Sequence, residues 1–172
     1  MDLAGLFGDK SIKAKAKVAR IGEWLLNDEL PTNELLAFAE TKKGAELATA
    51  IEALEYATSR KPGIADENVF RLVTKALGTA EPKVKWESAR VIGNVAHRFP
   101  DQLENVIDSL LPTARHTGTV VRWATAYALG EILKLNTDHN HKLLPAIEKL
   151  SAQEEDNGVR KKYVDALKKV KK

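Results

Sequence analysis

The chain has 172 residues and a mass of 19.0 kDa, which suffices for one domain with a substantial core. With 44% apolar and 30% charged residues, the composition excludes a disordered or low-complexity chain. Because cysteine is absent, disulfides, thiolate metal sites and cysteine nucleophiles are excluded as well.

The formal net charge of +3 is concentrated at the two ends of the chain. Residues 1–20 sum to +3 and residues 159–172 to +6, so the part between them sums to −6. The sequence pI of about 9.0 is therefore weak evidence for a nucleic-acid ligand. The start of the chain lacks the features of a signal peptide, and no apolar run approaches the roughly 20 residues of a membrane span. We expect a cytoplasmic protein that does not bind membranes.

Apolar residues recur with helical spacing almost throughout, and no segment shows the alternation of a strand. A clear case is the run of apolar residues between 103 and 114, which follows the i, i+3, i+4, i+7 pattern of one buried face. In chain order, the predicted helices cover residues 10–27, 32–42, 44–59, 65–78, 83–98, 101–116, 119–135, 140–153 and 158–171.

Residues with known capping preferences lie at these predicted boundaries. Pro31 and Pro82 suit the first turn of a helix, where the missing N–H is not needed. Asp101, followed three residues later by a glutamate, predicts a capping box, and Thr119 and Asp156 are further predicted caps.

Glycine and proline mark the ends of other predicted helices. Gly78 and Gly118 lie where a chain leaving a helix favours a positive φ angle. Pro112 lies inside a predicted helix and should kink or end it.

The sequence repeats itself, which favours a stack of helical hairpins over a closed bundle. Residues 84–94 recur at 121–131, and a weaker copy occupies 159–167. Residues 18–22 and 50–54 form two more degenerate copies, and the second aligns Leu54 with Gly93. A period of about 37 residues that holds two helices is typical of a solenoid.

The shared pattern of an apolar residue, a basic residue, then Ala and Leu/Ile-Gly resembles the HEAT repeat, most clearly over residues 82–135. In its short form this repeat is related to the armadillo repeat and to the repeats of phycobilin lyases. The resemblance implies an all-α fold: a single domain over 1–172, built as a right-handed α-solenoid of about four hairpins plus a C-terminal capping helix. Gly93 and Gly130 inside helices predict close approach of a neighbouring helix. In the last copy, Lys161, Lys168 and Lys171 predict a polar cap.

Few residues of the sequence suggest a catalytic or metal-binding site. His139 and His141 lie beside Asp138, but two histidines in a loop occur readily by chance, and exposed loop polarity is the simpler interpretation. No phosphate loop, nucleophile elbow or zinc-protease motif is present. We therefore predict no catalytic residue, no metal site and no cofactor, and a protein that is not an enzyme.

The main hypothesis is a monomeric scaffold that binds a protein or peptide, preferentially an acidic one, on its concave face. The resemblance implies that the second helix of each hairpin lines that face. The polar residues which helical-wheel positions then expose to a partner are Asn68, Arg71, Lys75, Asn105, Ser109, His116, Lys142 and Lys149.

The alternative hypothesis is nucleic-acid binding. HEAT-like alkylpurine DNA glycosylases resemble this chain, and they present aromatic and arginine side chains with a catalytic aspartate to DNA on a concave face. The residues of matching type are Trp86, Arg90, Arg122, Trp123 and Tyr127. An aspartate one turn after the tryptophans is missing, which counts against glycosylase activity.

Two further features are open to competing interpretations. Lys85, Arg122 and Arg160 form a basic ladder, which we expect to pair with acids of an adjacent repeat; a strip for phosphate or acidic peptide is the rival. The equivalent tryptophans most simply pack between repeats.

A third possibility is a structural subunit of a larger assembly. In that case Leu3, Leu6 and Phe7 would form an exposed apolar patch at the first repeat.

Overall fold

The computed structural model describes residues 2–170, and within that range it contains helices and no strands. The α-helices are α1 (Leu3–Gly8), α2 (Ala14–Leu26), α3 (Thr32–Glu40), α4 (Gly44–Arg60), α5 (Glu67–Ala76), α6 (Pro82–Val95), α7 (Leu103–Leu110), α8 (Thr119–Leu133), α9 (Asn140–Gln153) and α10 (Asn157–Val170).

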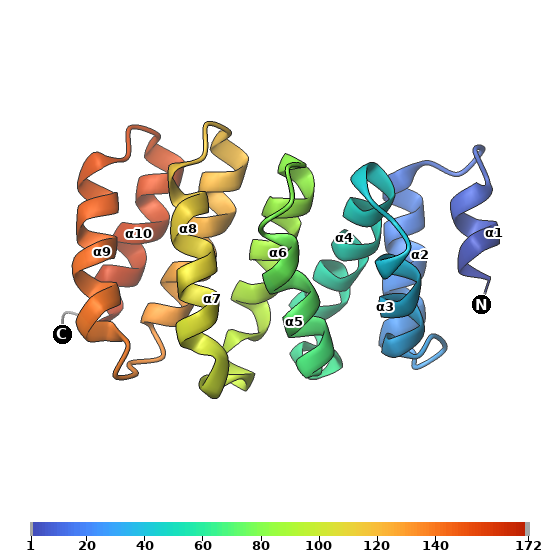
Figure 1. The fold of residues 1–172 in the computed structure, drawn as a ribbon, viewed down its shortest axis with the longest axis horizontal. Coiled ribbons are helices and arrows are strands. Elements are labelled where there is room, and N and C mark those ends of the chain that lie inside the picture. The colour runs from blue at the N-terminus through green and yellow to red at the C-terminus, as the bar shows by residue number, and fades with distance from the viewer. Residues whose placement is uncertain (1, 171–172) are drawn as a thin grey trace.

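The helices form two rows (Figure 1). Helices α3, α5, α7 and α9 lie in one row, and α2, α4, α6, α8 and α10 lie behind them in the other. Consecutive helices form the hairpins α2–α3, α4–α5, α6–α7 and α8–α9, with α10 at the end. The predicted α-solenoid of four hairpins and a terminal helix is confirmed.

The sequence prediction missed α1. Leu3 and Leu6 are buried, and the ring of Phe7 lies 4.7 Å from that of Phe38 in α3. The Lys17 ammonium donates a hydrogen bond to the carbonyl oxygen of Phe7 at 2.8 Å, which holds the end of α1 against α2. The predicted exposed apolar patch at the first repeat is therefore wrong, because α1 uses these side chains to cover the first hairpin.

Two of the predicted caps also differ. Asp101 lies in a short 3-10 turn (Pro100–Gln102), and α7 begins after Gln102, which makes no side-chain capping bond. Gly118 takes the N-cap position expected for Thr119. Asp156 does cap α10, since its carboxylate accepts from the Val159 N–H at 2.9 Å.

Proline has the expected effects with one difference of position. Pro82 opens α6 in its first turn, whereas Pro31 precedes α3 as its N-cap. Pro112 ends the α-helical part of the 101–116 segment, because residues Leu111–Arg115 continue as a 3-10 helix.

The predicted positive φ angles are wrong for both glycines. Gly118 has a φ of −77°, and Gly78 is not among the residues with positive φ. The described glycine with a left-handed backbone is Gly44, at the start of α4, with a φ of +59°.

Glycines inside helices receive side chains from the next hairpin. A Cβ added to Gly93 would lie 2.3 Å from the ring of Tyr127, and one added to Gly22 would lie 2.2 Å from that of Tyr56. A Cβ on Gly130 would meet Ala166 of α10 at 3.1 Å. The predicted close approach is thus confirmed, and it packs α2 on α4, α6 on α8, and α8 on α10.

The tyrosine contacts also correct the alignment of the early repeats. The hydroxyls of Tyr56 and Tyr127 each donate to a residue 33 positions earlier, the one that follows the contacted glycine. Tyr56 therefore occupies the position of Tyr127. The alignment that placed Leu54 opposite Gly93 is wrong for α4.

The far end of the stack is polar. Lys161 is exposed and pairs with Asp165 at 2.6 Å, and Lys168 is exposed as well. These positions agree with a polar cap, whereas Lys171 lies outside the described residues. None of the helices in residues 2–170 is long and apolar enough to cross a membrane.

Candidate partner-binding surface

A groove of about 980 Å³ lies between α3 and α5. Leu36 and Ala37 line it from α3, Leu72 lines it from α5, and Leu47 of α4 contributes from the other row. The polar side chains along its edges are Asn33, Glu40, Lys42, Asn68, Arg71, Lys75 and Thr79. The groove combines an apolar lining with a charged rim, as binding pockets commonly do.

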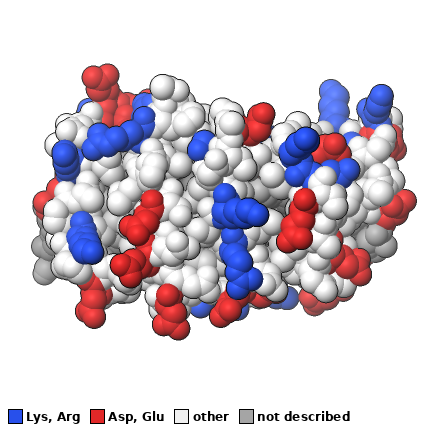
Figure 2. Space-filling model, in the orientation of Figure 1, with Lys and Arg blue, Asp and Glu red and all other residues white. Residues whose placement is uncertain are grey.

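Two cations stand one turn apart on the α5 side of this groove. Arg71 and Lys75 are both exposed, and Figure 2 shows Lys and Arg side chains gathered over α5. Arg71 donates to the side-chain oxygen of Asn68 at 3.0 Å. No ion pair to either cation is among those found in residues 2–170. Acidic side chains lie over the neighbouring α7, where Glu104 and Asp108 are exposed.

A smaller hollow of about 360 Å³ continues the surface from α5 toward the 3-10 turn after α7. Lys75 borders it as well as the first groove, and Lys85, Ser109 and His116 line it further along. The Nδ1 atom of His116 accepts a hydrogen bond from the Gly118 N–H at 2.8 Å, which fixes the ring at the edge.

The structure thus brings together five of the eight residues predicted for partner binding. Asn68, Arg71, Lys75, Ser109 and His116 line these two hollows. The other three, Asn105, Lys142 and Lys149, are exposed on α7 and α9 but line none of the described hollows.

The apolar part of the groove was missed by the sequence reasoning. That reasoning selected polar positions on helical wheels, whereas Leu47 and Leu72 are half-buried residues that look like core in the sequence. They line a groove because α3 and α5 contact each other only sparsely. The distance between two helices of different hairpins is not indicated by the local sequence of either helix.

The residues of the nucleic-acid hypothesis lie in the other row. Arg90 pairs with Glu55 and with Glu87, each at 3.1 Å. The hydroxyl of Tyr127 donates to Asn94 at 2.6 Å, so it too is engaged within the stack. Because the Arg90 guanidinium already binds two carboxylates, few of its N–H groups remain to bind phosphate.

Packing between repeats explains Trp123. Its ring stacks on Tyr127 with centroids 6.1 Å apart, and the Lys162 ammonium of α10 lies 4.8 Å from its centroid. The predicted inter-repeat packing is confirmed for Trp123. Trp86 is partly buried against the core.

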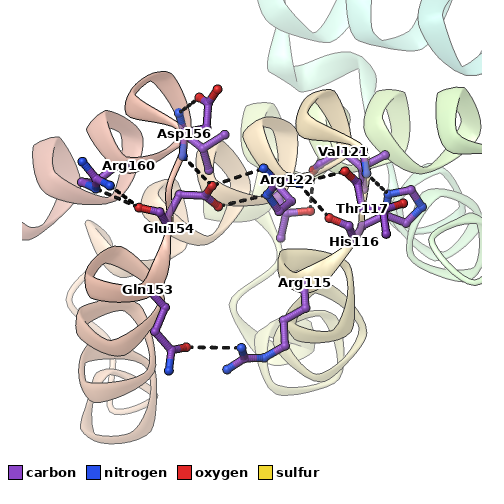
Figure 3. A network of polar contacts seen from close by, with 12 residues as sticks. Arg115, His116, Thr117, Val121, Arg122, Gln153, Glu154, Asp156 and Arg160 are labelled. Carbon is purple, nitrogen blue, oxygen red and sulfur yellow. Dashed lines mark hydrogen bonds and ion pairs between the residues drawn. The ribbon is translucent and has the colours of Figure 1, made fainter.

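Arg122 belongs to a polar network that joins the last two repeats (Figure 3). Its guanidinium binds both carboxylate oxygens of Glu154, at 3.1 and 3.3 Å, and donates to the carbonyls of His116 and Thr117 at 3.0 Å. The Arg122 and Glu154 side chains are only 20% and 7% exposed. Arg160 binds the backbone carbonyl of Glu154 from the other side.

The basic ladder has a different role from the one predicted. Lys85 donates to the carbonyl of Leu77 at 2.8 Å, and Lys17, Arg122 and Arg160 likewise bind carbonyls just before their own helices. Among these four, only Arg122 forms an ion pair within residues 2–170, and its partner Glu154 ends α9 of the same hairpin, so the predicted pairing with an acid of an adjacent repeat is wrong. The shared function is to satisfy carbonyls at the end of the preceding helix or turn.

The two predicted sets of binding residues lie in opposite rows, although both were assigned to the concave face. The α5, α7 and α9 residues belong to the front row in Figure 1, and the α6 and α8 residues to the rear row. Neighbouring helices contact each other extensively in the rear row and sparsely in the front row. Which row is concave stays a prediction.

Glu87 is an unusual buried acid in the rear row. Its side chain is 1% exposed, and its Oε2 atom has no hydrogen-bond partner among the described residues. Burial raises the pKa of Glu87 from 4.5 to about 7; Arg90 lowers it, while Glu52 and Glu55 raise it. Glu87 lines neither the groove between α3 and α5 nor the smaller hollow beside it.

Within residues 2–170, no group of three His, Asp or Glu side chains is arranged to hold a metal ion. His139 and His141 lie at the start of α9, where His139 is its N-cap residue.

Residues 70–168 match the family model of HEAT repeats, and no curated protein matches the chain. A computationally designed armadillo repeat protein for modular peptide recognition is 20% identical, with 96% of this chain and 79% of that chain covered and a TM-score of 0.70.

Two other solved structures are similar in fold. A designed armadillo repeat protein in complex with the peptide (KR)4 is 20% identical over 94% of this chain and 77% of that chain, with a TM-score of 0.73. The complex of CpcE and CpcF of phycocyanin lyase from Nostoc sp. PCC7120 gives 16% identity, 88% and 98% coverage and a TM-score of 0.59. At identities this low, the similarity shows a shared fold and nothing beyond it.

Proposed function

Because the chain belongs to the HEAT-repeat family, we propose that it is a scaffold which binds a protein or peptide on the α3–α5–α7–α9 face. The observation that carries this proposal is the pair of cations Arg71 and Lys75 beside an apolar groove, neither of which forms an ion pair with a residue in the range 2–170. The partner segment should be acidic, because it then supplies the carboxylates that these cations lack.

The two rows of the stack support the same assignment. In the rear row, Arg90 and Arg122 are engaged by glutamates of the protein itself. In the front row, the cations of α5 remain available. This contrast supports the front row as the binding surface and weakens the nucleic-acid alternative, which needs Arg90 and Arg122 for phosphate.

The similar solved structures add limited support. One designed armadillo repeat protein is in complex with a basic peptide, (KR)4, so a helical stack of this fold is able to hold a peptide. The charge preference proposed here is the opposite one and rests on Arg71 and Lys75. We further propose that the protein acts without catalysis, as a monomer and in the cytoplasm.

The test compares how the wild type and a charge-reversed variant of this protein bind purified partners. Proteins that co-purify from the native cell are identified, produced separately and titrated by calorimetry against the wild type and against Arg71→Glu/Lys75→Glu. We expect at least a tenfold loss of affinity, because two attractive contacts become repulsive.

The matched control is Lys13→Glu/Lys15→Glu, the same change of charge near the start of α2. It should leave the affinity within twofold of the wild type. Thermal melts should show that both double variants fold, since all four residues are exposed. Equal affinity of the wild type and the α5 variant would contradict the proposal.

A further inference from the structure

The groove between α3 and α5 has a shape that selects one kind of ligand backbone. Apart from Ala39 and Ala76, the residues of these two helices that line the groove are 33, 36, 37 and 40 of α3 and 68, 71, 72 and 75 of α5. Both sets follow the i, i+3, i+4, i+7 spacing of one helical face. Two helical ridges thus border a trough that is about 10 Å long, as a rise of 1.5 Å per residue gives.

A β-strand ligand has nothing to pair with in this trough. Both walls are helices, whose backbone N–H and C=O groups are bonded within each helix. A guest must therefore satisfy its own backbone. A polyproline segment would require an aromatic-lined groove, and no aromatic residue lines this one. An α-helix, which pairs its own backbone and packs ridges into grooves, remains.

The lining sets the composition of the guest helix. Leu36, Ala37, Leu47 and Leu72 offer apolar contact along the trough, so the guest needs an apolar stripe facing them. On the α5 wall, Arg71 and Lys75 are one turn apart. Carboxylates three or four residues apart on the guest match that spacing.

The opposite wall carries a different charge. Asn33 and Glu40 stand on the α3 side, and Lys42 nearby is paired with Glu46 at 3.5 Å and lies over the ring of Phe38. The acidic flank of the guest must therefore face α5 and not α3. This asymmetry fixes how the guest helix is rotated about its axis.

We propose that the α3–α5 groove binds a short amphipathic α-helix of a partner protein, with an apolar stripe and a pair of acids along one flank. The proposal rests on the scaffold function above and deepens it, because it states the site and the conformation of the ligand.

The probe is a displayed library of 14-residue peptides with random sequence. Peptides selected on the wild type are synthesised with a fluorescent label and titrated by anisotropy. We expect the selected sequences to share two or more apolar residues with helical spacing, and Asp or Glu pairs three or four residues apart. They should gain helical circular dichroism on binding.

Variants then locate the site. Arg71→Glu/Lys75→Glu and, separately, Ala37→Trp should each weaken binding at least tenfold, the first by repulsion and the second by filling the trough. Ala37 is exposed, so the indole has room to be accommodated, and the α5 variant tests the groove without any added bulk. Replacing both acids of a selected peptide by lysine should restore binding to the α5 variant and not to the wild type.

The neutral control is Lys13→Glu/Lys15→Glu near the start of α2, which should leave binding within twofold. Lys142→Glu/Lys149→Glu on α9 changes the proposed face outside the groove, and it should weaken the short peptides less than the groove variants do. If that variant weakens binding while the groove variants do not, the groove assignment is wrong and the binding face stands. If peptides bind and no variant of this row matters, both proposals are wrong. Selection of no peptide, or of peptides without acids, overturns the groove proposal.

Discussion

The two rows of helices are built from the same repeats but use their charges differently. In the rear row, Arg90 and Arg122 are held by glutamates, and Tyr127 packs over Gly93. In the front row, Arg71 and Lys75 have no ion pair in the described part of the chain, and the helices stand apart. We therefore expect the rear row to hold the stack together, and we propose the front row as the binding surface. Substitutions should accordingly cost stability in the rear row and binding in the front row.

The largest expected loss of stability comes from the contact between α6 and α8. Gly93→Val places a branched side chain where even a Cβ would lie 2.3 Å from the Tyr127 ring. The ring is held by its hydrogen bond to Asn94 and its stacking on Trp123, so it cannot move without losing both. The free energy of unfolding should fall by about 3 kcal/mol, as measured by urea denaturation.

The control for this substitution is Gly8→Ala at the end of α1. An added Cβ there meets nothing within 4 Å, and the φ angle of Gly8 is not positive. The expected change is below about 0.5 kcal/mol. A Gly93→Val protein as stable as the wild type would show that the two helices are not in close contact.

A smaller loss is expected from Arg122→Ala, which leaves Glu154 buried without its cation. Such a broken pair costs about 2 kcal/mol, less than a fully buried one, because Arg122 is partly exposed. Lys142→Ala in the front row removes an exposed cation that forms no ion pair with residues 2–170, and it should change the stability by less than about 0.5 kcal/mol. Equal losses for the two variants would remove the distinction between the rows.

The smallest effect depends on pH and concerns Glu87. Because its pKa is about 7 in the folded protein and 4.5 in the unfolded chain, the folded state binds more protons between these values. Stability therefore falls as the pH rises from about 4.5 to 7, and it stays low above pH 7. Glu87→Gln should flatten this decline.

The gain for Glu87→Gln at pH 8 should be about 1–2 kcal/mol, since loss of the ion pair with Arg90 offsets part of the benefit. At pH 4 the variant and the wild type should be equally stable. Denaturant melts across this range check both values. A wild-type stability that rises from pH 4.5 to 7, with no change in the variant, would contradict the assignment.

Periodic features of the sequence predicted the fold well. The recurrence of residues 84–94 at 121–131 led to the solenoid, and Gly93 and Gly130 predicted the close helix contacts. Local features predicted less. The Asp101 cap was wrong because Pro100 starts a 3-10 turn instead of an α-helix, and α1 was missed because six residues give too short a periodic pattern.

Of the candidate site, only the charged residues could be predicted from the sequence. Arg71 and Lys75 follow from their exposed positions on a helix. The groove beside them depends on how far apart α3 and α5 lie, which is decided by the packing of α4 between hairpins and not by either helix alone. The basic ladder failed for a similar reason, since its carbonyl partners are backbone groups that carry no sequence signature.

In the Gly22–Tyr56 and Gly93–Tyr127 contacts, the glycine and the tyrosine belong to different hairpins, and this restricts how the order of the hairpins can change in evolution. A hairpin that carries Tyr127 fits only behind one that offers a glycine, as Gly93 does. Moving this hairpin behind one that lacks a glycine at that position would set the Tyr127 ring against a side chain. These contacts therefore restrict the order of the hairpins, and substitutions at the contact in one hairpin must be matched by its neighbour.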